Sequence, residues 1–255
     1  MPLFAPLDRL LVPAAAPERI GWIGAFTYAH RGLWGAGVPE NSLAAFAAAA
    51  ERGLGIELDA RLASDGLAVV FHDHTLERMT AEQGLVLERK AEELGRVALE
   101  DSAEPIPSLR QALDLVASRV PILIELKCEH RTAVPALCAA VRRDIAAYAG
   151  PHAVMSFEPR VSRWFARHAP DVPRGLSFRA SGRDRLPALV HRRLAFWRAR
   201  PHFLTCDIAG LPLRLVAHQR ARGLPLVAWT VTSAEQRATA KTYADALIAE
   251  GAGLG

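Results

Sequence analysis

Short apolar runs alternate with amphipathic helical patterns along nearly the whole chain. Nine runs have the length and residue types of strands, and they lie at 22–29, 55–59, 67–72, 121–127, 153–157, 174–178, 202–207, 225–231 and 245–249. Helical spacing of apolar residues lies between them at 43–52, 108–118, 132–148, 159–168, 185–199, 212–222 and 233–243. Strands that alternate with helices indicate a parallel sheet, and about eight such units predict a TIM (β/α)8 barrel of the α/β class. Because nine runs are one too many, we expect one of the last three to be an extra or irregular strand.

The link between the second and third predicted strands is too short for a crossover helix. Only residues 60–66 connect them, whereas a parallel crossover takes about a dozen residues or more. If Asp59 and His72 are to reach the same mouth of the barrel, this link must run back down it in extended form. We therefore expect a helix-less crossover that turns at Ser64-Asp65-Gly66. The alternative is an antiparallel hairpin, which we expect to place His72 at the wrong end.

The length of the chain suits one barrel, so we expect a single domain over residues 1–255. Segment 74–106 interrupts the alternation of strands and helices with many charged residues. A polar excursion of this length predicts a flap or small subdomain beside the active site, where loops shape substrate access.

Composition favours a cytoplasmic protein. Hydrophobic residues make up 51% of the chain, which is enough for a large core. The three cysteines, Cys128, Cys138 and Cys206, cannot all pair within the chain, and this favours a reducing compartment. The N-terminus has no basic start and no continuous apolar run, so we expect neither a signal peptide nor a membrane span.

The chain is basic, with a net charge of +4 and a pI of about 9.3. Much of the excess comes from arginines between residues 160 and 200, which we interpret as solvated helix faces. A nucleic-acid-binding protein would need interleaved aromatic platforms or a docking motif, and neither is evident. A mild positive field would instead steer a small anionic substrate toward the protein.

Ionisable side chains stand at the ends of several apolar runs, as they do in the active sites of parallel α/β barrels. Glu57 and Asp59 share one face of a strand because extended residues alternate between faces. Two carboxylates this close repel each other unless a cation or a proton neutralises them, so they are either metal ligands or partners of nearby arginines. Glu125, at the end of another strand, adds a third carboxylate and favours the interpretation as metal ligands. Three oxygen ligands suit Mg²⁺ or Ca²⁺ better than zinc.

Two histidines and two cationic residues accompany these carboxylates. His30 and His72 each follow an apolar run, and imidazole can take and return a proton at neutral pH, so we interpret them as an acid–base pair. Arg31 offers a planar fork for phosphate and Lys127 a point charge. A salt bridge from Arg31 to Glu40 is the structural alternative for that arginine.

The order of these motifs points to a family. It runs through His30-Arg31-Gly32, Pro39-Glu40-Asn41-Ser42, Glu57-x-Asp59, Asp65-Gly66, Val69-Val70-Phe71-His72-Asp73, Ile106-Pro107-Ser108-Leu109, Ile124-Glu125-Leu126-Lys127, Ser156-Phe157 and Trp229-Thr230-Val231. From residue 28 to residue 231 the chain thus resembles the glycerophosphodiester phosphodiesterase family. Two positions depart from the family pattern: Thr232 replaces the usual Asn, and Ala249-Glu250-Gly251 replaces a Thr-Asp pair before a proline. Both bear on the rim of the substrate pocket.

The resemblance implies a phosphatidylinositol-phospholipase-C-like barrel that hydrolyses glycerophosphodiesters to glycerol 3-phosphate and an alcohol with a divalent cation. The roles that it implies are metal binding by Glu57, Asp59 and Glu125, acid–base catalysis by His30 and His72, phosphate contact by Arg31 and Lys127, further substrate contact by Phe157 and Trp229, and support by Glu40 and Asn41. It also implies attack by the glycerol 2-hydroxyl through a cyclic phosphate. Which histidine is the acid and which the base stays open.

Three other functions fit parts of this pattern. A lysophospholipase D would use the same ions and histidines but would need a longer apolar groove, which the excursion and Trp34 would shape. A non-catalytic barrel that binds anions is the second, and a basic nucleic-acid-binding protein is the third.

Overall fold

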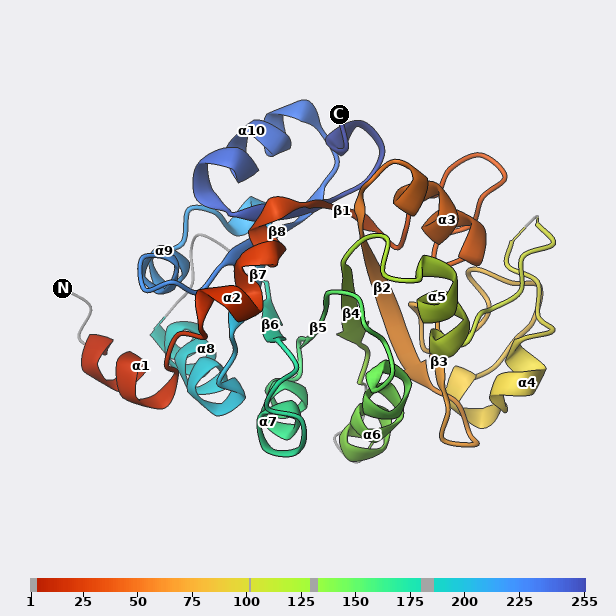
Figure 1. The fold of residues 1–255 in the computed structure, drawn as a ribbon, viewed down its shortest axis with the longest axis horizontal. Helices are drawn as coiled ribbons and strands as arrows, with labels where there is room; N and C mark the ends of the chain where they lie inside the picture. Colours follow the sequence, from red (N-terminus) through yellow and green to blue (C-terminus); the bar gives the residue numbers. More distant parts are fainter. Residues whose placement is uncertain (1–3, 101, 129–132, 180–185) are drawn as a thin grey trace. The chain divides into compact units, whose positions relative to one another are not determined.

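The computed structural model describes residues 4–255 except 101, 129–132 and 180–185 (Figure 1). The chain forms two compact units, one of residues 28–152 and the other of the N-terminal segment up to residue 27 together with residues 153–255. The expectation of a single domain stays a prediction. None of the helices in the described part of the chain combines the length and apolar character that a membrane crossing needs.

The unit of residues 28–152 places three parallel strands side by side. Its elements are β1 (Thr27–His30), α3 (Leu43–Glu51), β2 (Gly55–Leu62), β3 (Ala68–Val70), η2 (Val86–Glu88), α4 (Ala91–Leu94), α5 (Leu109–Val116), β4 (Ile122–Leu126) and α6 (Val134–Ile145). Strand β2 pairs in parallel with β1 and with β4, so His30 lies opposite Glu57, and Asp59 lies opposite Glu125. This register brings the polar strand ends of the unit together.

The other unit continues the alternation of strands and helices. It contains α1 (Ala5–Leu11), α2 (Pro17–Ile20), η1 (Gly21–Ala25), β5 (His152–Ser156), α7 (Pro159–His168), β6 (Arg174–Phe178), α8 (Leu186–Ala199), β7 (Phe203–Asp207), η3 (Ile208–Gly210), α9 (Arg214–Arg220), β8 (Leu226–Val231), α10 (Ala234–Tyr243), β9 (Ala246–Ala249) and η4 (Gly251–Gly253). Strands β5 to β9 pair in parallel in chain order. Apolar side chains of β6 to β9 form a core with Phe196 and Val216 from the helices.

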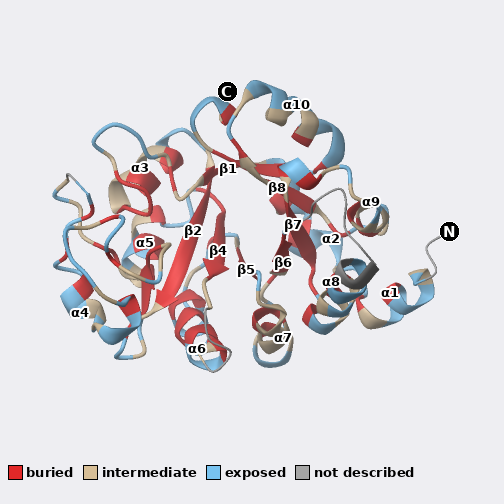
Figure 2. Cartoon of the chain, turned by 180° about the vertical axis from the view of Figure 1, so that it is seen from behind, coloured by how far each residue is buried: buried red, intermediate tan, exposed pale blue. Residues whose placement is uncertain are grey.

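The fold class is the predicted one. Eight parallel strands (β1, β2 and β4 to β9) with helices between successive strands give the described chain the elements of a TIM (β/α)8 barrel. All seven predicted helices are present, although residues 132 and 185, where two were expected to begin, lie outside the described residues. Ser42 and Ser108 cap two of them, because each hydroxyl accepts a hydrogen bond from the amide three residues on. Figure 2 shows the strands as the most buried part of the cartoon.

Two expectations about strands were wrong. The extra strand is β3 and not one of the last three, although the pairing of β8 with β9 is irregular between Ala228 and Val231. The start of the first predicted strand, residues 22–25, is part of the 3-10 helix η1 instead. Gly21 and Gly24 flank Trp22 and Ile23 there, and glycine weakens a strand because it adds backbone freedom and no side chain to pack.

The link between β2 and β3 is an antiparallel hairpin, so the predicted parallel crossover was wrong. Ala60 pairs with Val70, and Leu62 with Ala68. The turn lies at Ser64-Asp65-Gly66, as expected, and it contains no helix, but it follows the C-terminal end of β2. The inference that a hairpin would put His72 at the wrong end was also wrong. Strand β2 continues for three residues beyond Asp59 before the turn. Strand β3 then runs antiparallel to it over the same length, so the chain returns to the level of Asp59 just before His72.

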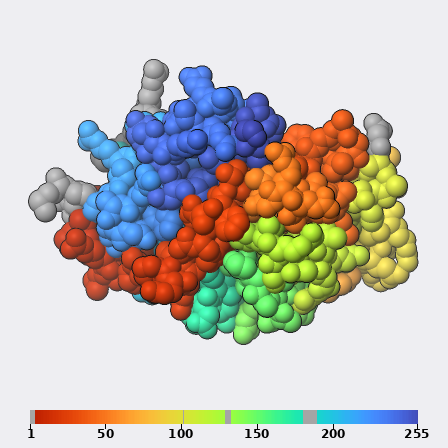
Figure 3. Space-filling model, turned by 45° about the horizontal axis from the view of Figure 1, so that its top comes forward, coloured from red at the N-terminus to blue at the C-terminus, as the bar shows by residue number. Residues whose placement is uncertain are grey.

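The excursion of residues 74–106 has an apolar core of its own. Leu76, Val86, Leu94 and Leu99 are each no more than 1% exposed, and they cluster with Phe71, which follows β3. Short antiparallel bridges join Thr75 to Leu85 and Ala98 to Pro105 within it. The excursion is therefore a small packed layer on its unit, seen in yellow in Figure 3.

Gly32, just after Arg31, sits where a side chain would collide with α3. Its φ is +82°, and an added Cβ would lie 2.8 Å from the Cβ of Ala45. Gly37 has nearly the same φ, +78°, but has nothing within 4 Å of the added atom. An alanine at either glycine would strain the backbone, but only an alanine at Gly32 would also overlap a neighbour. Comparison of the two substitutions therefore distinguishes the two costs.

We expect Gly37→Ala to lower the free energy of unfolding by about 1 kcal/mol because of its positive φ. We expect Gly32→Ala to lower it by about 1–3 kcal/mol more, because Ala45 and the backbone around it must move. Urea unfolding of both variants measures the difference. Equal losses would show that the contact between Gly32 and α3 is not tight.

Candidate active site

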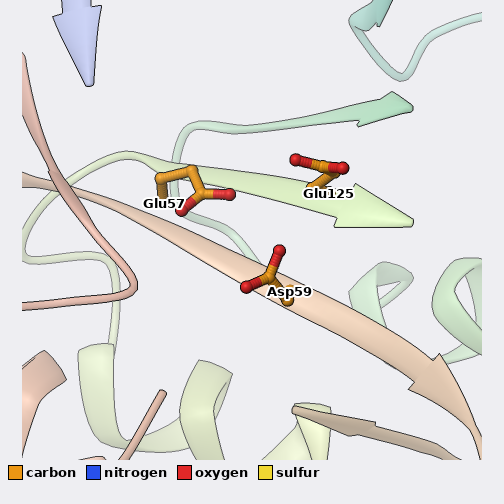
Figure 4. Close-up of side chains that lie close together, drawn as sticks. All are labelled: Glu57, Asp59 and Glu125. Carbon is orange, nitrogen blue, oxygen red and sulfur yellow. The ribbon is translucent and has the colours of Figure 1, made fainter. Parts of the chain in front are cut away.

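Three carboxylates from two neighbouring strands meet at the centre of the candidate site (Figure 4). Glu57 and Asp59 lie on one face of β2, and Glu125 lies on β4 directly opposite Asp59. One oxygen from each of the three lies within 4.8 Å of the others. Glu57 and Asp59 are each 1% exposed and Glu125 is 8% exposed, so the cluster is shielded from water. The sequence placed these three together correctly.

The electrostatics of this cluster favour a bound cation. Burial, together with the charge of Asp59, raises the pKa of Glu57 to about 8. Burial also raises the pKa of Glu125. Burial acts in the same direction on Asp59, but Lys127 and Arg31 outweigh it and lower the pKa of this carboxyl. Carboxylate oxygens are the ligands of hard divalent ions, so these three residues could hold such a metal.

Two cationic side chains border the cluster. The Nζ of Lys127 lies 2.8 Å from an oxygen of Glu125 and 3.1 Å from one of Asp59. The Nε of Arg31 lies 3.3 Å from Asp59, and the Arg31 amide donates a hydrogen bond to Glu57 at 3.1 Å. These contacts place two positive charges at the border of the carboxylate cluster.

Arg31 also makes the salt bridge that was the structural alternative for it. Its Nη1 contacts both carboxylate oxygens of Glu40 at 2.9 Å. Asn41, the next residue, donates to Asp59 at 2.9 Å through its side-chain amide and accepts from the Asp59 backbone N–H at 3.2 Å. Glu40 and Asn41 therefore tie the loop after β1 to the carboxylate cluster.

His30 is the last residue of β1, and His72 lies two residues after the end of β3. His30 pairs in register with Glu57, and its positive form would lower the pKa of that carboxyl. The hairpin places Phe71 opposite Asp59, where its amide donates a 3.0 Å hydrogen bond to the Asp59 carbonyl oxygen. His72 is the next residue, close enough for the charge of Asp59 to act on its imidazole. Both histidines thus belong to the same set of strand ends as the carboxylates.

Asp73 is a neighbour of His72 whose contact the sequence did not predict. Its carboxylate lies 2.6 Å from Nδ1 of His72. This contact favours a proton on Nδ1 and leaves Nε2 to exchange protons. Burial is the largest influence on His72 and lowers its pKa, against the effects of Asp59 and Asp73. The contact could have been suspected from the sequence, because Asp73 is an acidic residue directly next to a candidate catalytic histidine.

Phe157 and Trp229, the other predicted substrate contacts, lie in the unit that contains β5 to β9. Their rings meet edge to face with centroids 5.4 Å apart. The indole N–H of Trp229 is buried and has no hydrogen-bond partner among the described residues. A buried donor without a partner suits a polar ligand, and the substrate role of both residues stays a prediction.

A cavity of about 260 Å³ adjoins Lys127. Four leucines contribute to its wall: Leu62 at the end of β2, Leu85 and Leu87 in the excursion, and Leu137 on α6. Two of them, Leu85 and Leu87, are 38% and 43% exposed. The cavity offers room for an apolar substituent beside the charged cluster.

Comparisons with known proteins agree with this geometry. Residues 30–250 match the model of the Glycerophosphoryl diester phosphodiesterase family. The protein YhdW of Bacillus subtilis (strain 168) is 27% identical over 232 residues, which cover 86% of this chain and 90% of that protein. The Glycerophosphodiester phosphodiesterase of Caldanaerobacter subterraneus subsp. tengcongensis is 39% identical over 98 residues, 36% of this chain and 40% of that protein.

A solved structure agrees in fold. An Oleispira antarctica phosphodiesterase, in complex with the product sn-glycerol-3-phosphate, has a TM-score of 0.74 to this chain at 23% identity, and the match covers 88% of this chain and 92% of that one. This likeness supports the barrel fold independently of the sequence pattern.

We expect Mg²⁺ or Ca²⁺ to raise the Tm of metal-free protein, because a ligand that binds only the folded state stabilises it. Glu125→Gln keeps the shape of the side chain but removes one charged ligand, and should weaken cation binding about tenfold or more. Calorimetric titration measures this directly. Asp114→Asn, on the outer face of α5 with its side chain 67% exposed, is the matched control. Equal affinities in the two variants would contradict the assignment of Glu125.

Proposed function

The chain belongs to the glycerophosphoryl diester phosphodiesterase family, and we propose that it is an enzyme that hydrolyses glycerophosphodiesters to glycerol 3-phosphate and an alcohol. The observation that carries this proposal is the buried cluster of Glu57, Asp59 and Glu125 with Lys127 and Arg31 at its border. A cluster of this kind can bind a metal ion and a phosphate at once. It lies wholly within the residues that match the family model.

The chain's own residues would divide the work of the reaction. Glu57, Asp59 and Glu125 hold a divalent cation, Mg²⁺ or Ca²⁺, which when bound supplies positive charge against the phosphate. Lys127 and Arg31 add charge that stabilises the transition state.

His30 and His72 move the protons. One takes the proton of the glycerol 2-hydroxyl as that oxygen attacks phosphorus, and the other protonates the leaving alcohol. The cyclic phosphate that results is opened by water, with the two roles reversed. The hydrogen bond between Asp73 and His72 supports this proposal because it holds the ring in one tautomer.

The leucine-lined cavity favours a second candidate activity. An enzyme that cleaves lysophospholipids in the manner of a lysophospholipase D needs an apolar surface beside its phosphate site, and the cavity at Lys127 supplies one. Turnover of an acylated substrate and of the deacylated substrate with the same head group separates the two activities. For location we propose the cytoplasm, which is supported by the three free cysteines.

We expect purified protein to release glycerol 3-phosphate from glycerophosphocholine or glycerophosphoethanolamine in the presence of Mg²⁺ or Ca²⁺. An excess of chelator should abolish this release, and the added cation should restore it. Product analysis by chromatography follows both reactions. Full turnover in excess chelator would rule out the metal, and binding without turnover would favour a non-catalytic anion-binding barrel.

His30→Ala and His72→Ala should each lose about 10²–10⁴-fold in kcat, the usual cost of removing a positioned acid or base. His191→Ala is the control, because this histidine is exposed on α8 in the other unit. Steady-state kinetics, with circular dichroism to confirm folding, give the comparison. A folded variant of either residue that keeps the wild-type rate would remove that histidine from the mechanism.

A further inference from the structure

Arg78, in the excursion after β3, touches both halves of the candidate site. We infer that Arg78 is a positioning residue with two tasks. Through Asp73 it orients His72, which would transfer a proton, and through Glu40 it holds Arg31, which would bind the phosphate. The inference rests on the proposed function, because it assigns catalytic work to His72 and Arg31.

The first contact reaches His72. The Nε of Arg78 donates a short hydrogen bond to one oxygen of Asp73, and the other oxygen of Asp73 lies 2.6 Å from Nδ1 of His72. Asp73 is thus held from both sides, so neither its carboxylate nor the imidazole can rotate independently. Arg78 orients the histidine through this carboxylate.

The second contact reaches Arg31. The Nη2 of Arg78 donates to Glu40 at 2.6 Å, and Glu40 also accepts from Arg31 at 2.9 Å. Glu40 is only 8% exposed, and these two guanidinium groups hold its carboxylate in place. Arg31 in turn contacts Asp59. Arg78 therefore helps to fix the arginine that would meet the phosphate.

The chemistry of this position calls for arginine. Asp73 and Glu40 are bound by different nitrogens of one planar group, a geometry that the point charge of lysine cannot reproduce. Burial acts against the charged form of Arg78, but its hydrogen bonds to Glu40 and Asp73 dominate and raise its pKa. The backbone that carries it is anchored, because Leu76 and Met79 on either side are buried in the core of the excursion.

This arrangement predicts a linked effect on both kinetic constants. Without Arg78, Asp73 is held from one side only and orients His72 less firmly, so kcat falls. Arg31 is also less well held through Glu40, so KM rises. Misplacement of catalytic groups by about 1 Å can cost about 10²-fold in rate. A purely structural role would instead lower the fraction of active protein, which reduces the apparent kcat and leaves KM unchanged.

The test compares Arg78→Gln and Arg78→Lys with Arg89→Gln, using glycerophosphocholine as substrate. Arg89 lies in the same excursion and pairs with Glu82 at 3.0 Å, away from the carboxylate cluster contacts described above. We expect both substitutions of Arg78 to lower kcat/KM about 10²-fold through kcat and KM together, and Arg89→Gln to have little effect. Because the Arg78 side chain is 47% exposed, we expect its variants to fold, and the milder Arg78→Lys serves if Arg78→Gln does not.

A double-mutant cycle makes the test specific. Glu40→Gln and Asp73→Asn should be strongly non-additive in kcat/KM when Arg78 is present, and additive when it is replaced by Gln. Wild-type kinetics in Arg78→Gln would overturn the inference, and so would additive effects of Glu40→Gln and Asp73→Asn in protein that retains Arg78. Loss of activity in His72→Ala would still uphold the proposed function in either case. A wild-type protein without turnover would overturn both.

Discussion

The structure depends on one electrostatic constraint, which is that three carboxylates are buried side by side on two parallel strands. Mutual repulsion and burial both act against the charged forms of Glu57 and Glu125. Cations must therefore be held close to the cluster. Lys127 meets this need from the end of β4, and Arg31 meets it from the loop after β1. A divalent metal would complete the balance of charge.

The segments around the cluster are arranged to keep those charges in place. The left-handed backbone of Arg31 and Asn41, with φ of 58° and 57°, turns the loop after β1 so that both side chains reach Asp59. The excursion acts through its own core, which anchors Arg78 against Glu40 and Asp73. Arg31, Asn41 and Lys127, which contact the cluster through their side chains, thus come from a strand end or from a loop tied to one.

Much of the site could be predicted because it follows from local periodicity. Glu57, Asp59 and Glu125 could be brought together from the alternation of strand faces and from the rule that parallel strands end at one edge. The end of β2 could not be predicted. Arg61 interrupts the apolar pattern, and its polar side chain concealed the extension of the strand, although in the structure this residue is only 8% exposed and donates to the His72 carbonyl oxygen.

Contacts between distant segments were the other part that the pattern did not reveal. The Glu40–Arg78 contact joins residues 38 positions apart in loops without periodic spacing, and it requires the packed excursion to exist first. The N-terminal helices α1 and α2 were missed for a different reason. They are 7 and 4 residues long, too short for an apolar stripe to be recognised.

The β2–β3 hairpin has a consequence for how the chain can change in evolution. The position of His72 relative to Asp59 is set by a ladder of three residue pairs, Ala60 with Val70, Arg61 with Val69 and Leu62 with Ala68. Residues inserted in the turn at 63–67 lie outside this ladder and leave it intact. A single residue inserted between 68 and 72 would rotate the histidine to the opposite face of the strand. Natural variation in length should therefore concentrate at the tip of the hairpin, while the return leg stays constant in length.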